Sequence, residues 1–211
     1  MKLVSYTSRA VQAQELAQLV AHELQAAIQT KHKATAAFAG GTTPVLFFEA
    51  LAKQAVEWSK VAFTLTDERQ VAADNERSNA LLLQTHLLAH LQPPASFQGL
   101  YDSGQAANDL TALAVLLKQD FLPLDVVVLG MGNDGHFASL FPQAPNLAVG
   151  LDPNNPNILL EVAAPDLTEA RISFSLAALL SAKQLHLLIT GADKKQVLEQ
   201  AQANLAADQP R

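Results

Sequence analysis

A chain of 211 residues is long enough for one sizeable core, so we expect residues 1–211 to form a single α/β domain. Hydrophobic residues make up 49% of the chain and charged residues 16%, which excludes a disordered protein. The net charge of -6, with no run of lysine or arginine, argues against nucleic-acid or anionic-membrane binding, and the lack of cysteine excludes disulfides and thiolate chemistry.

The N-terminal half predicts alternating helices and strands. Residues 10–30 form an amphipathic helix, because apolar side chains recur on one face at helical spacing. These side chains are Leu16, Leu19, Val20, Leu24 and Ile28. Strands are expected at 35–39 and 61–66, a helix from Pro44 to about residue 56, and another helix from Ser78 to Leu88.

The C-terminal half continues the alternation. Strands are expected at 125–129, 158–163, 171–176 and 185–190, helices at 105–119 and from Asp193 onward, and loops at 91–103 and 142–157. The run 125–129 is continuously apolar, which suits a parallel strand covered on both faces. We therefore predict a Rossmann-like α/β fold, with a mainly parallel sheet, helices on both faces, and a small excursion around residues 142–176.

No segment of the sequence is typical of a membrane or secreted protein. The longest apolar runs fall short of the roughly 20 residues of a membrane span. Met1–Tyr6 lacks the apolar core of a signal peptide. We expect a cytoplasmic protein.

Three polar loops follow predicted strands directly, namely Gly40–Thr43, Asp67–Arg69 and Gly130–His136. Ligands of open parallel sheets gather beyond the carboxyl ends of the strands. These loops should therefore meet at one edge of the sheet.

The loop Gly40-Gly41-Thr42-Thr43 leads into a predicted helix. Helix-start amides lack intrahelical partners, and glycine lets the backbone approach an anion closely, so a phosphate could bind here. A simple strand-to-helix turn capped by threonine explains the same residues. This loop alone does not decide between the two interpretations.

The loop Gly130–His136 places three glycines beside Asn133, Asp134 and His136. A turn needs at most two of those glycines, so the backbone should pass close to a ligand. Histidine has the side chain whose ordinary pKa lies nearest neutrality, and Asp134 could orient it. We predict His136 as a general base; the alternative is a surface histidine in a turn.

Asp67-Glu68-Arg69 puts two acids and a base at a strand end. A solvated charge cluster, or a salt bridge that holds a loop, would explain this pattern equally well. Arg69 nevertheless suits a phosphate, because its planar guanidinium binds two oxygens at once.

His86 and His90 have the spacing of metal ligands on a helix. No HExxH pattern or third ligand accompanies them, so a solvated helix face is the favoured interpretation. We predict no catalytic metal.

Five segments together resemble, in order and spacing, the 6-phosphogluconolactonase family within the glucosamine-6-phosphate isomerase-like superfamily. They are Ala39–Pro44, Thr66–Arg69 with Ser78–Asn79, Gly130–Pro142, Arg171–Leu176 and Thr190–Lys194. They span residues 39–194, which is most of the chain. The third segment is long and specific.

The resemblance implies hydrolysis of 6-phosphogluconolactone to 6-phosphogluconate in the oxidative pentose phosphate pathway, without a cofactor. His136 would then activate water, with Asp134 orienting it and Asp67 as a second carboxylate. The residues expected to bind this phosphosugar lactone are Gly40, Gly41, Thr42, Thr43, Arg69, Gly132, Arg171 and Lys194. Lys195, beside Lys194, could serve equally well.

Two alternatives remain. The superfamily's deaminating isomerases carry a loop resembling Gly-His-Ile-Ala-Phe-Asn-Glu-Pro, whereas Leu140-Phe141 stands here in place of Asn-Glu. The loss of that acid favours the lactonase. A sugar-phosphate sensing module would keep the phosphate loop, lose the catalytic loop and add a DNA-binding segment, yet Asp134 and His136 are both present.

One departure concerns the C-terminus. Lactonases of the family usually continue past the last helix into a final strand with an aromatic near its end, whereas this chain ends at Ala207–Arg211. The alternatives are a divergent C-terminus and a truncated chain, either of which would lack the usual edge strand.

Overall fold

The computed structural model describes residues 2–104, 109–164 and 167–206, and their strands form two sheets. The larger sheet is parallel and has the order β4-β2-β1-β5-β8. Its strands are β1 (Ala34–Phe38), β2 (Val61–Leu65), β4 (Ser96–Phe97), β5 (Val126–Leu129) and β8 (Gln184–Leu187). The smaller, antiparallel sheet has the order β3-β7-β6 and consists of β3 (Asp67–Arg69), β6 (Leu159–Val162) and β7 (Arg171–Phe174).

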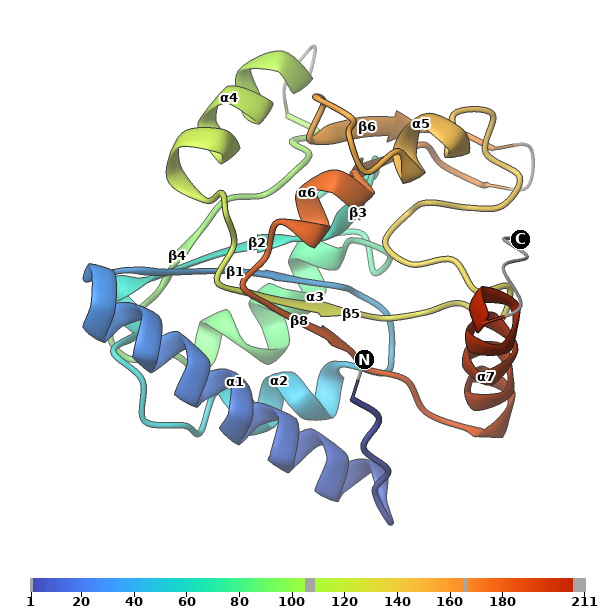
Figure 1. Cartoon of the computed structure of the whole chain (residues 1–211). Coiled ribbons are helices and arrows are strands. Elements are labelled where there is room, and N and C mark those ends of the chain that lie inside the picture. The colour runs from blue at the N-terminus through green and yellow to red at the C-terminus, as the bar shows by residue number, and fades with distance from the viewer. Residues whose placement is uncertain (1, 105–108, 165–166, 207–211) are drawn as a thin grey trace.

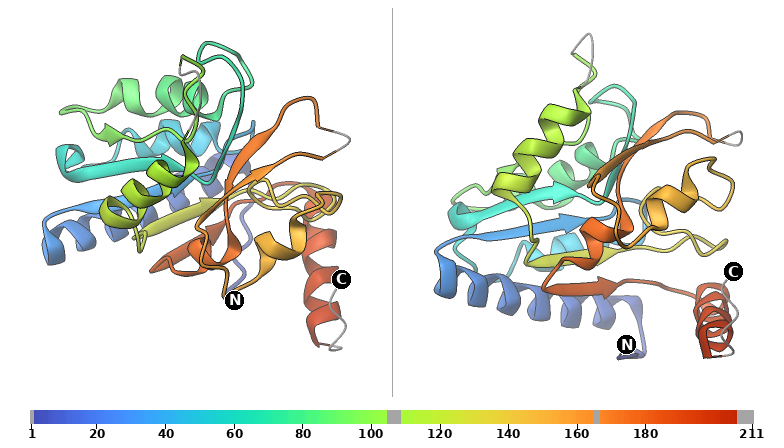
Figure 2. Two further views of the ribbon diagram at one scale, coloured as in Figure 1. Left: turned by 90° about the horizontal axis from the view of Figure 1, so that it is seen from above. Right: turned by 45° about the horizontal axis from the view of Figure 1, so that its top comes forward.

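Helices cover both faces of the parallel sheet (Figure 1). One face carries α1 (Arg9–Lys31), α2 (Val45–Leu51) and α3 (Asn79–His86), and the other carries α4 (Leu110–Asp120) and α6 (Leu176–Leu180). The remaining helical segments are α5 (Leu147–Leu151), α7 (Ala192–Ala206) and the short 3₁₀ turns η1 (Trp58–Lys60) and η2 (Leu88–His90). Figure 2 shows α7 standing apart from the sheet, beyond the carboxyl end of β8. The predicted α/β architecture is confirmed.

The core lies between β1, β5 and the helices on both sides. Every residue of β1 and of β5 is buried, as expected of central parallel strands. The ring centroid of Phe38, on β1, lies 5.4 to 5.8 Å from those of Phe47, Phe48 and Phe63. This aromatic cluster fixes α2 against β1 and β2, and so holds the loop between β1 and α2 in place.

Three segments predicted as loops contain short regular elements instead. Asp67–Arg69 forms β3, because it pairs with β7 far along the chain. Residues 91–103 include β4, which adds to the edge of β2, and residues 142–157 include α5. Elements this short show no periodic pattern, and partners remote in sequence determine them.

Several predicted bounds also differ. The helix begun at Pro44 ends at Leu51, and the strand expected at 171–176 ends at Phe174, because Ser175 caps α6 through the amide of Ala178. The helix expected at 105–119 begins at Leu110, although residues 105–108 lie outside the described part of the chain. In α1, Leu19 is 45% exposed and does not belong to the buried stripe.

Two further expectations concern membrane-spanning segments and the C-terminal strand. No helix within residues 2–104, 109–164 and 167–206 is long and apolar enough to cross a membrane. Residues 207–211, on which the expectation about a final strand falls, are not among those described.

Candidate active site

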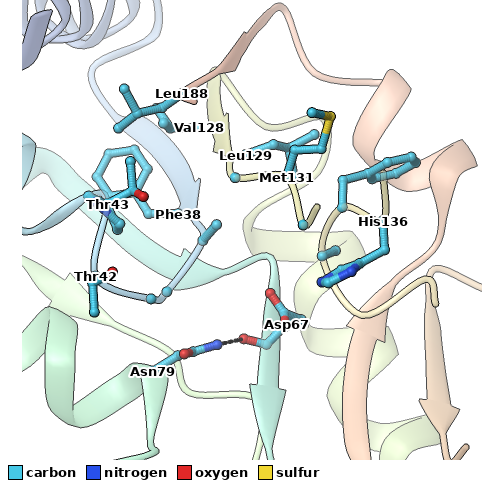
Figure 3. A pocket seen from close by; sticks show the side chains of 18 of the residues that line it. Phe38, Thr42, Thr43, Asp67, Asn79, Val128, Leu129, Met131, His136 and Leu188 are labelled. Carbon is cyan, nitrogen blue, oxygen red and sulfur yellow. Dashed lines mark hydrogen bonds between the residues drawn. The ribbon is translucent and has the colours of Figure 1, made fainter. Parts of the chain in front are cut away.

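A cavity of about 380 Å³ lies at the carboxyl ends of the parallel strands, and Figure 3 shows side chains of several elements pointing into it. The three loops predicted to converge do meet there. The predicted site residues that line the cavity are Gly40, Gly41, Thr42, Thr43, Asp67, Arg69, Gly132, His136, Arg171 and Lys194. Asp134, the remaining one, does not line the cavity but forms a hydrogen bond with the His136 ring.

His136 and Asp134 form a tight pair. Nδ1 of the imidazole lies 2.6 Å from Oδ1 of Asp134, which also accepts the His136 backbone N–H. Burial alone would raise the pKa of Asp134, but the hydrogen bond and the charge of His136 lower it below its ordinary value. The carboxylate therefore holds Nδ1 of a side chain that lines the cavity, and it does not engage the other ring nitrogen, Nε2.

Asp134 and His136 can approach each other only because residue 132 is a glycine. A Cβ at this position would overlap Oδ1 of Asp134 and the imidazole of His136. The Gly132 amide donates to the His136 carbonyl at 2.8 Å, so it is already engaged within the loop. Gly132 thus lines the cavity without offering this amide to a ligand.

Asp67 is buried at the cavity wall and has hydrogen bonds to both carboxylate oxygens. Oδ1 accepts from the Thr66 hydroxyl at 2.9 Å, and Oδ2 accepts from the Ser139 hydroxyl at 2.7 Å. The Ser139 amide in turn donates to Oγ of Ser173, the residue paired with Asp67 across β3 and β7. Ser139 therefore connects the segment that follows His136 to the small sheet.

Two arginines lie side by side because Arg69 of β3 pairs with Arg171 of β7. Arg171 is only 6% exposed, and its Nη2 lies 3.0 Å from Glu169, which also binds Arg77. Burial, followed by the charge of Arg69, lowers the pKa of Arg171, while Glu169 and Asp67 oppose this change. The Nε atoms of Arg69 and Arg171 are buried and have no hydrogen-bond partner, so this cationic pair keeps donors unused.

The loop Gly40–Thr43 is supported from beneath by Asn79. A Cβ on Gly40 would overlap the Asn79 amide, whose Nδ2 donates to the Asp67 carbonyl at 2.9 Å (Figure 3). Gly41 has a φ of 92°, a conformation that favours glycine. Asn79 therefore connects the predicted phosphate loop to β3.

Glu68 joins β3 to the start of α3. Its carboxylate accepts hydrogen bonds from the amides of Arg69, Asn79 and Ala80 and from the Ser78 hydroxyl. Burial raises the pKa of Glu68, and the four hydrogen bonds act in the opposite direction. Glu68 thus has a structural position and is not among the residues that line the cavity.

The structure distinguishes Lys194 from its neighbour. Lys194, in the first turn of α7, lines the cavity, whereas Lys195 lies 3.6 Å from Glu199 on the same helix.

His86 and His90, which have the spacing of metal ligands, do not lie on one helix. His86 lies in α3 beside Glu49, and His90 lies in η2. Among the described residues, no three acidic, histidine or cysteine side chains are grouped to hold a metal ion.

Sequence reasoning assigned no role to three side chains of the site, Asn79, Ser139 and Phe141. All three fall within the segments that carry the family resemblance, which was the available signal. Their contacts are with residues on other elements or on the far side of a turn, and only the folded chain reveals these partners.

This site belongs to an α/β fold in which loops at one edge of the parallel sheet bring Asp134 and His136 together, beside two arginines of the small sheet. A family profile described as glucosamine-6-phosphate isomerases/6-phosphogluconolactonase matches residues 7–211. The chain is 42% identical to a 6-phosphogluconolactonase of Rhizobium meliloti (strain 1021) over 91% of this chain and 83% of that protein. It is also 42% identical to one from Pseudomonas putida, over 90% and 79%.

Solved structures of 6-phosphogluconolactonases also match this chain. A 6-phosphogluconolactonase from Shewanella baltica superposes with a TM-score of 0.86 at 35% identity, covering 93% of this chain and 84% of that one. A monomeric glucosamine-6-phosphate deaminase shares the fold alone, with a TM-score of 0.76 at 17% identity over 97% and 88% of the two chains. The chain belongs to the 6-phosphogluconolactonase family, a family of lactone hydrolases, within the glucosamine-6-phosphate isomerase/6-phosphogluconolactonase superfamily.

Proposed function

We propose that this protein hydrolyses 6-phosphogluconolactone to 6-phosphogluconate, with His136 as the general base. The observation that carries the mechanism is the 2.6 Å contact between Asp134 and Nδ1 of His136, at a cavity that Arg69 and the buried Arg171 also line. The relatives that are 42% identical bear the name of this activity. No step of the proposed reaction calls for a cofactor.

The proposed reaction begins with water in the cavity near Nε2 of His136. His136 takes one proton as the water oxygen bonds to the lactone carbonyl carbon, and the carbonyl electrons move onto the oxygen. The carbonyl then re-forms as the bond to the ring oxygen breaks, and His136 returns the proton to that oxygen. Asp134 keeps the imidazole oriented and stabilises its positive charge in between.

For the phosphate, the same proposal assigns Arg69, Arg171 and Lys194, together with the loop Gly40–Thr43. The two unused Nε donors support this assignment, since a guanidinium can present two N–H groups to one phosphate. Asp67, held by Thr66 and Ser139, would border the bound sugar.

The rival activities make different demands on the site. A deaminating isomerase would need an acid where Phe141 stands, and Phe141 instead packs on His136. A sensing module has no need of the Asp134–His136 contact. Both observations favour the lactonase.

The decisive assay supplies fresh 6-phosphogluconolactone and follows 6-phosphogluconate with a coupled dehydrogenase, after subtraction of spontaneous hydrolysis. We expect the protein to exceed the blank by orders of magnitude. A rate equal to the blank would refute the proposal. Release of ammonia from glucosamine 6-phosphate, measured in parallel, would instead identify an isomerase.

A further inference from the structure

Phe141 contacts both the proposed base, His136, and one of the proposed phosphate-binding residues, Arg171. The centroid of its ring lies 4.3 Å from that of the His136 imidazole, and the two planes are inclined by 44°. The guanidinium carbon of Arg171 lies 5.9 Å from the centroid of the same ring. One aromatic side chain therefore contacts the proposed base and a cation of the proposed phosphate site.

The backbone before Phe141 is held firmly enough to fix this ring. Ala138 has a φ of 48°, which a residue with a side chain rarely adopts unless its surroundings impose it. Next, Ser139 is fully buried and bonded to Asp67 and Ser173, and Leu140 is buried in turn. The turn at Ala138 lets the chain reverse, so that Phe141 packs against a residue only five positions earlier.

The contacts match what the proposed reaction needs. An aromatic face attracts a cation within about 6 Å of its centroid, and Arg171 carries a permanent charge. In the proposed reaction, His136 starts as the neutral base and carries a positive charge once it has removed a proton from water. A ring beside the imidazole therefore stabilises the charged intermediate more than the resting enzyme, which is the condition for lowering a barrier.

We propose that Phe141 is a positioning residue, which fixes the His136 imidazole relative to Arg171 and stabilises the imidazolium that forms during turnover. This inference rests on the proposed lactonase function. Asp134 restrains the imidazole through a hydrogen bond to Nδ1, and Phe141 restrains it by packing its own ring against the imidazole. Through Arg171, the same ring links the position of the base to that of the phosphate.

The kinetic test compares Phe141→Leu, which keeps apolar bulk but removes the aromatic face, with Phe141→Tyr, which keeps the face. For the leucine variant we expect kcat to fall roughly 2- to 30-fold, the range of a cation–π contact, with a smaller rise in KM from the loosened Arg171. The tyrosine variant should retain most of the wild-type kcat. Phe97→Leu, in the edge strand β4 and outside the cavity, is the matched control and should change neither constant.

A second measurement does not depend on turnover. The imidazole protons of His136, assigned by comparison with His136→Ala, should show a ring-current shift in the NMR spectrum that is lost in Phe141→Leu and kept in Phe141→Tyr. Phe141→Met, which also lacks the ring, serves if the leucine variant does not fold. Unchanged imidazole signals, or an unchanged kcat in an active enzyme, would overturn the inference. An inactive wild-type protein would refute the proposed function, whereas the NMR signals would still decide the role of Phe141.

Discussion

His136 is the residue on which the proposed chemistry depends most directly. Replacing it with alanine removes the proton acceptor but leaves the arginine pair and the loop Gly40–Thr43 in place. We expect His136→Ala to lower kcat by roughly 10²- to 10⁴-fold, the usual contribution of general acid–base catalysis, with little change in binding of 6-phosphogluconate. Steady-state kinetics and isothermal titration calorimetry would measure the two effects.

The control for this variant is His90→Ala, because His90 is an exposed residue of η2 outside the cavity. It should retain full activity. If His136→Ala kept nearly the wild-type rate, the base would have to be sought elsewhere, and Asp67 would be the next candidate.

Asp134 gives a prediction about stability and pH. Because His136 lowers the pKa of Asp134, the folded state favours the carboxylate, and the stabilisation is present above the ordinary value near 3.8 and is lost as pH falls through the lowered pKa. Its side chain is 49% exposed, so we expect Asp134→Asn to cost at most about 1 kcal/mol of unfolding free energy at neutral pH. Urea unfolding between neutral pH and the acid range would measure the difference.

This difference between wild type and Asp134→Asn should shrink as the solution is acidified below the ordinary pKa of aspartate. Asp74→Asn, on an exposed turn before α3, is the matched control. A difference that stayed constant or grew with acidification would contradict the proposed coupling between Asp134 and His136.

At the scale of elements, Glu68 of β3 links this strand to the start of α3 through hydrogen bonds. Each of its carboxylate oxygens accepts two hydrogen bonds, and glutamine would turn an N–H donor toward groups that also donate. We expect Glu68→Gln to lower the unfolding free energy by about 1 to 3 kcal/mol, the cost of buried groups left unsatisfied. Chemical denaturation would measure it. Glu57→Gln, which changes an exposed ion pair with Lys60, should leave the denaturation midpoint essentially unchanged.

The elements also show what sequence patterns can and cannot predict. Strands β1 and β5 were predictable because each is an unbroken run of small or apolar residues, and α1 because its apolar residues recur at helical spacing. The short strands β3 and β4 have no such pattern, since pairing with distant segments creates them. Most of the predicted site residues lie at one cavity because the loops Gly40–Thr43 and Gly130–His136 follow strands that end at the same edge of the sheet.

At the scale of the whole molecule, the side-chain contacts within the site were beyond reach of sequence patterns. The packing of Phe141 on His136 depends on a left-handed residue at position 138, and the link from Ser139 to Asp67 depends on how the small sheet docks. Such contacts arise only when the large and small sheets are placed together. The sequence could therefore propose candidate residues for the site, but it could not predict how their side chains contact one another.

The pairing of β3 with β7 has a thermodynamic consequence. Arg69 and Arg171 repel each other, yet they come from distant parts of the chain and become neighbours only on folding. An anion that bridges them binds the native state alone, so at a hundred times its Kd it should raise the unfolding free energy by about 2.7 kcal/mol. Thermal denaturation with 6-phosphogluconate would reveal this stabilisation, which Arg171→Ala should largely abolish and His136→Ala should preserve.

If the ligand gave the same protection to Arg171→Ala as to wild type, the phosphate would have to bind elsewhere. A phosphosugar bound between Arg69 and Arg171 would link β3 and β7, which are far apart in the sequence. The metabolite concentration around the protein would then set the fraction of chains that remain folded, in addition to the fraction of sites that are occupied.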